Sequence, residues 1–169
     1  MRLLIVLLAL LMPAPWAAAA AEAPSDTAPR PAPSHDDMVV VALSLIGTPY
    51  QFGGASPETG FDCSGLVQYI LGLSSPVTLP RNSDAMYRQG AGRAVALRDL
   101  RAGDLLFFRL GQSRRVNHVA VYIGEDRFVH APSRGGFVRV DKLDSKYWMR
   151  YFLAAKRVLP ENDLVATHP

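Results

Sequence analysis

Residues 61–67 read FDCSGLV and contain Cys63, the one cysteine of the 169-residue chain. The residues before them, 53–60 (GGASPETG), are typical of turns, and Leu66 and Ile70 follow at helical spacing. The sequence therefore predicts a helix that begins at Cys63. Free backbone N–H groups and the helix dipole in a first turn favour the thiolate, so we expect a reactive cysteine with a lowered pKa. The alternative is a buried structural cysteine, the common state of a lone cysteine.

Two of the four histidines lie where they could act with this cysteine. His35 and His168 are near the ends of the chain, and we expect them to be solvated. His118 and His130 instead lie inside segments whose apolar and β-branched residues predict strands. A single strand histidine is usually structural, but two that share a face with a poised cysteine nearby favour a catalytic site.

The sequence between the two histidines predicts that they are neighbours. Residues 124–126 (GED) suit a three-residue hairpin loop, which would put Ala120 opposite His130. His118 would then be the diagonal neighbour of His130 on the same face, about 7–8 Å away at the backbone. A shift of one residue would separate them onto opposite faces, so the prediction depends on this register.

Cys63, His118 and His130 together supply the groups that thiol catalysis requires. The thiolate attacks, one histidine stabilises it and protonates the leaving amine, and a further polar group fixes the orientation of that histidine. A metal site is the rival use of two histidines and a thiolate. The spacing matches no recurrent zinc motif, so we expect neither a metal nor another cofactor.

Helical patterns come first in the chain and short strands come later, which predicts an α+β domain. Helices are predicted over residues 34–47, 63–72 and 82–90, and strands over residues 104–108, 116–123, 128–131, 137–140 and 151–158. We expect the N-terminal helices to pack on a five- to six-stranded antiparallel sheet.

The ends of the chain differ in composition from the predicted domain. Residues 1–21 combine a charged start, a short apolar run and small residues, as a secretory signal peptide does. Residues 22–33 are rich in Ala and Pro and predict a disordered spacer. Residues 34–160 then form the folded domain, and residues 161–169 a flexible tail. The cleavage zone holds no cysteine, so we expect a soluble exported protein without a lipid anchor or stable membrane insertion.

Charge and cysteine content narrow the class of protein further. One cysteine allows no internal disulfide, so the core alone must stabilise the fold. The formal net charge of +3 is too small to indicate nucleic-acid binding. It suits an anionic cell-wall substrate, and a solvated surface explains it equally well. We expect a monomer.

Several segments, in order, resemble those of a known family. They are residues 47–54 (GTPYQFGG), 61–67 (FDCSGLV), 79–81 (LPR), 100–105 (LRAGDL), 117–124 (NHVAVYIG) and 128–132 (FVHAP). This set resembles the NlpC-type cell-wall cysteine peptidases, which are papain-like endopeptidases of peptidoglycan. The resemblance covers about residues 39–158, essentially the whole predicted domain.

The resemblance implies a role for each catalytic candidate. Cys63 would attack the peptide carbonyl, His118 would serve as general base and acid, and His130 would orient His118. The hydroxyl of Tyr50 would join the backbone N–H of Cys63 in the oxyanion hole. Without the resemblance, Tyr50 would be read as an aromatic residue that packs in a loop.

The resemblance also implies substrate contacts beside the nucleophile. Asp62 and Ser64 would line the substrate groove, and both could also cap the helix. Arg81 could meet a substrate carboxylate, or it could form a surface salt bridge. Two features depart from the family pattern. Met86 stands where the family often has Gln, and the sequence shows no additional wall-binding domain, as in the small single-domain periplasmic members.

These observations lead to one expected function and two alternatives. We expect an exported endopeptidase in the periplasm or cell wall that hydrolyses peptidoglycan stem peptides or cross-links through a Cys-His-His triad. The same triad would serve an amidase or acyltransferase acting on another amide. A non-catalytic wall-binding protein is the third interpretation. The D-glutamyl–diaminopimelate bond and the cross-link bond are both candidates for the bond that is cleaved.

Overall fold

The structure is a computed structural model that describes residues 34–90, 92–134 and 136–159. All of them belong to one compact unit. The predicted signal peptide, spacer and C-terminal tail lie outside the described residues. Among the described residues, no helix is both long and apolar enough to cross a membrane.

Four α-helices begin at side-chain caps that the sequence provides. They are α1 (His35–Ser44), α2 (Cys63–Ser74), α3 (Ser83–Gln89) and α4 (Lys146–Tyr151). Ser34, Asp62, Asn82 and Ser145 each accept a hydrogen bond from a backbone N–H of the first turn. The first three helices confirm the predictions from the sequence. Helix α4 was not predicted, because its six residues are too few to show an apolar period.

The strands form a six-stranded antiparallel sheet with the order β3-β8-β4-β5-β6-β7. Its members are β3 (Arg93–Val95), β4 (Leu105–Phe108), β5 (His118–Gly124), β6 (Arg127–His130), β7 (Arg139–Lys142) and β8 (Phe152–Arg157). A small separate hairpin joins β1 (Ala55–Ser56) to β2 (Gly60–Phe61), and a 3-10 helix, η1, covers Leu97–Asp99. The predicted α+β class is confirmed, and β3 is the sheet strand that the sequence did not reveal.

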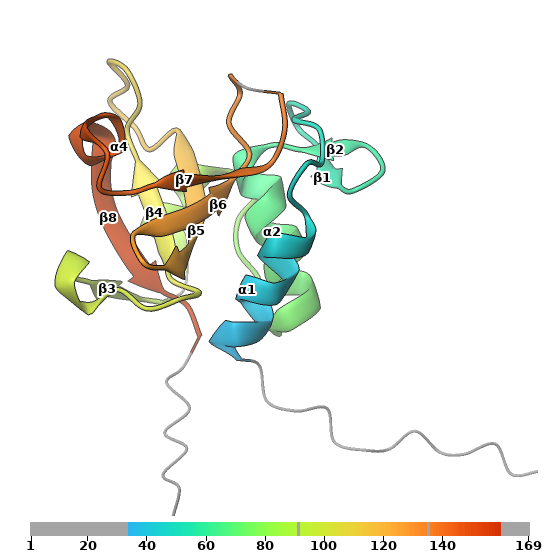
Figure 1. Cartoon of the computed structure of the whole chain (residues 1–169), viewed down its shortest axis with the longest axis horizontal. Coiled ribbons are helices and arrows are strands. Elements are labelled where there is room, and N and C mark those ends of the chain that lie inside the picture. Colours follow the sequence, from blue (N-terminus) through green and yellow to red (C-terminus); the bar gives the residue numbers. More distant parts are fainter. Residues whose placement is uncertain (1–33, 91, 135, 160–169) are drawn as a thin grey trace, which may run out of the picture. The chain divides into compact units, whose positions relative to one another are not determined.

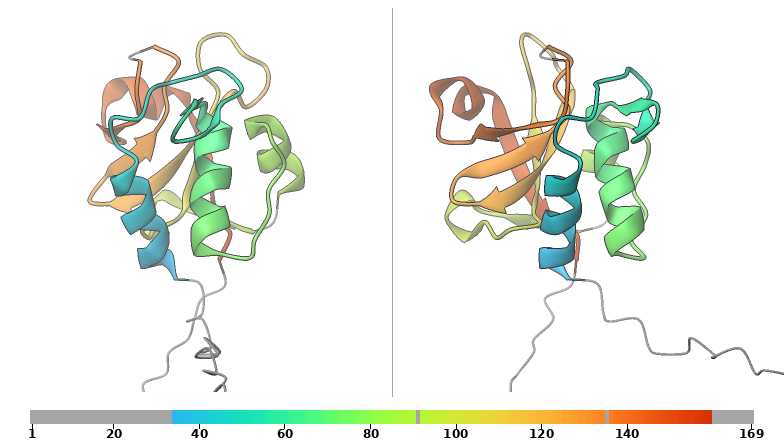
Figure 2. Two further views of the ribbon diagram at one scale, coloured as in Figure 1. Left: turned by 90° about the vertical axis from the view of Figure 1, so that its right-hand side faces the viewer. Right: turned by 45° about the vertical axis from the view of Figure 1, so that its right-hand side comes forward.

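Helices cover the sheet on both faces, as Figures 1 and 2 show. Helices α1 and α2 lie side by side along one face, and α4 lies on the other. Side chains of β5 alternate between two buried clusters. Val119 and Val121 pack toward α1 and α2, whereas Ala120 and Tyr122 pack toward Trp148 of α4. This alternation assigns His118, the first residue of β5, to the face that α4 covers.

The hairpin between β5 and β6 has the predicted register but a different turn. Tyr122 pairs with Phe128, and the turn contains two residues, Glu125 and Asp126, with φ of 51° and 53°. The pairing shifts by one residue between Tyr122 and Gly124, and this shift compensates for the shorter turn. The predicted three-residue loop is therefore wrong in detail. The expected pairing survives, and both histidines lie on one face.

The start of α2 packs unusually closely against the chain before it. A Cβ atom built on Gly65 would lie far inside van der Waals contact of the Gly54 carbonyl oxygen, which is backbone. Gly65 therefore lets the first turn of α2 approach the loop after Tyr50. This contact holds the start of α2, which begins at Cys63, against that loop.

We expect Gly65→Ala to lower the free energy of unfolding by about 2–3 kcal/mol, because the backbone of α2 would have to move away from Gly54. Gly72→Ala is the matched control in the same helix, since nothing lies within 4 Å of its Cβ position. That variant should gain about 0.5–1 kcal/mol from helix propensity. Urea unfolding of both proteins measures the difference, and equal effects of the two substitutions would contradict the close-packing argument.

Candidate active site

Cys63 is the first residue of α2, and a cluster of polar side chains fixes the chain beside it. Asp62 accepts hydrogen bonds from the Gly65 N–H at 2.7 Å and from the Ser64 hydroxyl at 3.0 Å. Arg81 donates to both carboxylate oxygens of Asp62, each at 2.8 Å, and to Ser64 at 2.8 Å. The structure thus joins Asp62, Ser64 and Arg81 in one network at the start of α2. Its immediate effect is to hold Cys63 in place.

A chain of hydrogen bonds connects the two histidines to a carboxylate. His118 Nε2 lies 2.9 Å from His130 Nδ1, and His130 Nε2 lies 3.1 Å from Asp141 Oδ2. His118 is 4% exposed and His130 is fully buried. The predicted approach of the two histidines is therefore confirmed. Asp141 was not a candidate from the sequence, because it comes close to His130 only through the pairing of β6 with β7.

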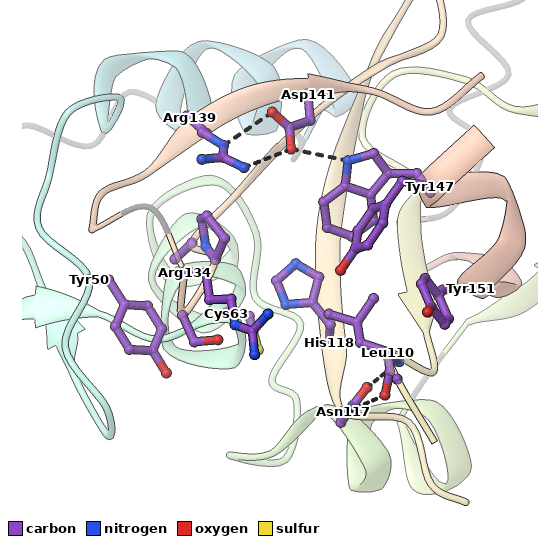
Figure 3. Close-up of a pocket in the computed structure, with 15 residues that line it drawn as sticks. Tyr50, Cys63, Leu110, Asn117, His118, Arg134, Arg139, Asp141, Tyr147 and Tyr151 are labelled. Atoms are coloured by element: carbon purple, nitrogen blue, oxygen red, sulfur yellow. Dashed lines mark hydrogen bonds and ion pairs between the residues drawn. The ribbon is translucent and has the colours of Figure 1, made fainter. Parts of the chain in front are cut away.

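The carboxylate sets the direction of every hydrogen bond in this chain. An ionised Asp141 can only accept, so His130 carries its proton on Nε2 and offers Nδ1 as an acceptor. His118 then donates from Nε2, which leaves its Nδ1 unprotonated. A histidine with this tautomer presents a free basic nitrogen on the ring edge opposite His130. Figure 3 shows His118 and Cys63 on the same cavity, where that nitrogen can serve the thiol.

Two further side chains hold Asp141 and His118 in position. Arg139 donates to Asp141 from Nε and Nη2 at 3.1 and 3.2 Å, and Trp148 donates from Nε1 at 3.0 Å. The Trp148 ring also stacks on His118 at an interplanar angle of 24°. Sequence reasoning missed Trp148, because α4 was not predicted. Arg139 and Asp141 lie at i and i+2 of a strand, so alternation could have placed them on one face.

Burial decides the protonation of the two candidate catalytic groups, Cys63 and His118. It raises the pKa of the partly buried Cys63 thiol to about 11, against a smaller lowering by the backbone N–H of Val119. It also lowers the pKa of His118 to about 3, helped by His130 and opposed by Asp141. The lowered thiol pKa expected from the helix start is therefore wrong for the resting protein. At neutral pH both groups are uncharged.

Asp141 remains ionised although it is partly buried. Burial alone would raise its pKa, but hydrogen bonds from His130 and Arg139 lower the pKa to about 2. Burial lowers the pKa of His130, and the hydrogen bond to Asp141 opposes this shift. Two neutral histidines thus lie between the Cys63 thiol and the negatively charged carboxylate of Asp141.

A cavity of about 540 Å³ contains the reactive groups. Its lining includes Tyr50, Cys63 and His118, together with Arg134, Asp141 and aromatic residues of α4 (Figure 3). Tyr50 is held there by a backbone hydrogen bond to Gly136 O at 2.8 Å, and burial raises the pKa of its hydroxyl.

The remaining candidates lie around this cavity without lining it. His130 stands behind His118, and the lining does not include Asp62, Ser64 or Arg81. Met86, at the position where the resemblance suggested Gln, lies in α3 and is buried in the core. Within the described residues, no group of three or more His, Cys, Asp and Glu side chains could hold a metal ion.

Comparisons with known proteins identify relatives of most of the described domain. The NlpC/P60 family matches residues 47–157 of the chain. The probable endopeptidase YafL of Escherichia coli is 39% identical over 120 residues, which cover 71% of this chain and 48% of YafL. The murein DD-endopeptidase MepH of Escherichia coli is 38% identical, over 72% of this chain and 45% of MepH. The chain therefore aligns with about half the length of these relatives.

Solved structures show the same fold. An NlpC/P60 family protein from Bacillus cereus superposes with a TM-score of 0.69 at 36% identity, covering 77% of this chain and 42% of that protein. The NlpC/P60 domain of the peptidoglycan hydrolase SagA superposes with a TM-score of 0.62 at 31% identity, covering 73% of this chain and 98% of that domain.

We expect alkylation of Cys63 by iodoacetamide to accelerate about tenfold per pH unit between pH 7 and 10, because a thiol with a pKa of about 11 is mostly protonated throughout this range. N-acetylcysteine is the control, and its rate should level off above its pKa of about 8.5. A Cys63 rate that is already constant at pH 7 would show a preformed thiolate and contradict the neutral resting pair. Circular dichroism at each pH checks that the protein stays folded.

Proposed function

The chain belongs to the NlpC/P60 family, and on this basis we propose that it is an exported cysteine endopeptidase that hydrolyses peptide bonds of peptidoglycan in the periplasm or cell wall. The observation that carries the proposal is the cavity shared by Cys63 and His118, with His118 hydrogen-bonded through His130 to Asp141. The related MepH is named a murein DD-endopeptidase, which favours a cross-link as the substrate. The predicted signal peptide supports export.

The first step forms a covalent bond to the enzyme. Sγ of Cys63 attacks the carbonyl carbon while the thiol proton moves to Nδ1 of His118. The π electrons of the carbonyl move onto its oxygen and give a tetrahedral oxyanion. The backbone N–H of Cys63 and the hydroxyl of Tyr50 are the proposed donors to this oxygen, and losing one such donor typically costs about 3–4 kcal/mol of transition-state stabilisation.

The second step releases the amine, and a third restores the enzyme. The C–N bond breaks as the His118 imidazolium gives its proton to the leaving nitrogen, and a thioester to Cys63 remains. A water molecule then loses a proton to His118 and attacks the thioester carbon. The C–S bond breaks, the thiolate recovers the proton, and the acyl part leaves as a carboxylic acid.

The hydrogen-bonded chain behind His118 explains why a neutral resting pair can react. Proton transfer turns His118 into an imidazolium, whose Nε2–H still donates to His130. The negative charge of Asp141 stabilises this cation through His130, and the stacked Trp148 ring adds a cation–π contribution. His118 thus becomes positively charged only as the sulfur of Cys63 attacks the carbonyl carbon. The environment favours the transition state over a charged ground state.

The network of Asp62, Ser64 and Arg81 suits the acyl side of the scissile bond. These residues adjoin Cys63 but do not line the cavity that His118 shares. His118 must reach the leaving nitrogen, so the amine side of the substrate lies in the cavity and the acyl side lies toward the network. We propose that Asp62 and Ser64 form the wall of the groove there and that Arg81, bound to both, keeps that wall rigid.

Digestion of purified cross-linked sacculi tests the proposed function. Wild-type protein should convert dimeric muropeptides to monomers, whereas Cys63→Ala should release none, since it lacks the nucleophile. Mass spectrometry of the products also identifies the bond, because cleavage of the D-glutamyl–diaminopimelate bond would instead shorten the stems to dipeptides. A sacculus left intact by folded wild-type protein would contradict the proposal and favour an amidase, an acyltransferase or a wall-binding protein. Turnover by Cys63→Ala would exclude the thiol mechanism.

We expect Asp141→Asn to lower kcat by about 10²- to 10⁴-fold, with a smaller change in KM. The amide can donate to His130 Nε2, which would reverse the direction of both hydrogen bonds and place the proton of His118 on Nδ1, facing the thiol. Asp144→Asn, at an exposed carboxylate before α4, is the control and should retain wild-type kcat. Nitrogen chemical shifts of the histidine rings report the tautomers directly. A wild-type tautomer and kcat in Asp141→Asn would remove Asp141 from the mechanism.

A further inference from the structure

The charges around the catalytic cavity do not balance. Three charged side chains line it, namely Arg134, Arg139 and Asp141. Arg139 and Asp141 neutralise each other through two hydrogen bonds, and Asp141 also accepts from Trp148. Arg134 is exposed and forms no hydrogen bond or ion pair with the rest of the described chain. The cavity therefore carries one uncompensated positive charge, on a guanidinium that points into it (Figure 3).

Arg134 lines the same cavity as His118, the group that must protonate the leaving nitrogen. Asp62 and Arg81 are outside this lining and adjoin the acyl side. A substrate bound across Cys63 would therefore bring the residue that supplies the amine toward Arg134. The acyl part of the substrate would remain beyond its reach.

We propose that Arg134 binds the free α-carboxylate of the residue whose amino group is released, an inference that rests on the proposed function. A planar guanidinium matches a carboxylate with two parallel hydrogen bonds. Tyr147 and Tyr151 line the same cavity and add polar hydroxyls on an aromatic wall, which suits a small charged residue better than an apolar side chain. The carboxylate replaces water around Arg134 and completes the charge balance of the cavity.

This chemistry distinguishes between the bonds of peptidoglycan. In a D,D cross-link the amine belongs to the diaminopimelate centre that carries its own free carboxylate. The terminal residue of an uncross-linked stem also has a free carboxylate next to its amide nitrogen. In an intact stem, the diaminopimelate centre joined to D-glutamate has its carboxyl group in a further peptide bond. Arg134 therefore selects cross-link or terminal bonds over the internal D-glutamyl–diaminopimelate bond.

A pair of soluble substrates tests this directly. One is a cross-linked muropeptide dimer with the free carboxylate, and the other is the same dimer with that carboxylate converted to a carboxamide. Wild-type kcat/KM should be about 10- to 100-fold higher for the carboxylate substrate, as expected for a hydrogen bond between charged groups. Arg134→Gln should lose this factor on the carboxylate substrate, so that its kcat/KM values for the two substrates become nearly equal. Arg134→Lys should retain part of the preference.

Two controls test whether an effect of Arg134→Gln arises from misfolding or from the loss of any positive charge. Arg98→Gln removes an arginine whose side chain is 87% exposed on η1 and does not line the cavity, so it should retain the full preference. Thermal unfolding confirms that each variant is folded. An uncross-linked tetrapeptide identifies the source of the carboxylate, because an Arg134 effect confined to this substrate would assign the site to the terminal residue.

Other outcomes would overturn the assignment. Equal losses on the carboxylate and carboxamide substrates would mean that Arg134 supports the cavity without reading the carboxylate. An Arg134→Gln variant with the wild-type preference would mean that the carboxylate binds elsewhere. If wild-type protein cleaves neither dimer nor sacculi, the proposed function fails together with this inference. If it cleaves sacculi and both dimers equally, only the role of Arg134 fails.

Discussion

The close approach of α2 to the loop before it is the constraint on which the site depends. Gly65 allows the first turn of α2 to touch the Gly54 carbonyl, and the Asp62 cap closes the same turn through the Gly65 N–H. Arg81 adds a hydrogen bond to Gly54 O at 3.1 Å and binds Asp62, so the loop and the helix start form one rigid body. This body carries both Tyr50 and Cys63. Their separation is thus set by backbone contact, which leaves little freedom for the proposed oxyanion site.

The sequence predicted the parts of the site that depend on local periodicity. Helical spacing after Cys63 identified α2, and strand alternation with a short loop placed His118 beside His130. The sequence did not reveal Asp141, because the loop between β6 and β7 is too long to predict how the two strands pair. Trp148 was missed for a similar reason, since its helix is too short for an apolar period and acquires its role only by packing on the sheet.

The pKa of Cys63 shows a different limit of sequence reasoning. The helix start favours a thiolate, and this local effect was correctly identified. Burial of the sulfur between α2 and β5 depends on the whole fold, and it outweighs the local N–H groups. The same burial keeps His118 neutral. A local motif therefore identifies the candidate nucleophile, whereas the tertiary structure determines whether its thiol is ionised in the resting protein.

The two arginines of the cavity have different surroundings, and we propose different roles for them. Arg139 lies on a strand, where its guanidinium is held by Asp141, and the pair stabilises the charge that sets the histidine tautomers. Arg134 lies in the loop between β6 and β7, where no carboxylate of the described chain neutralises it. A loop can vary without disturbing the sheet, so a charge placed there can change specificity while the catalytic hydrogen bonds stay intact. The proposed roles therefore place substrate selection and proton transfer on different parts of the fold, although both groups face the same cavity.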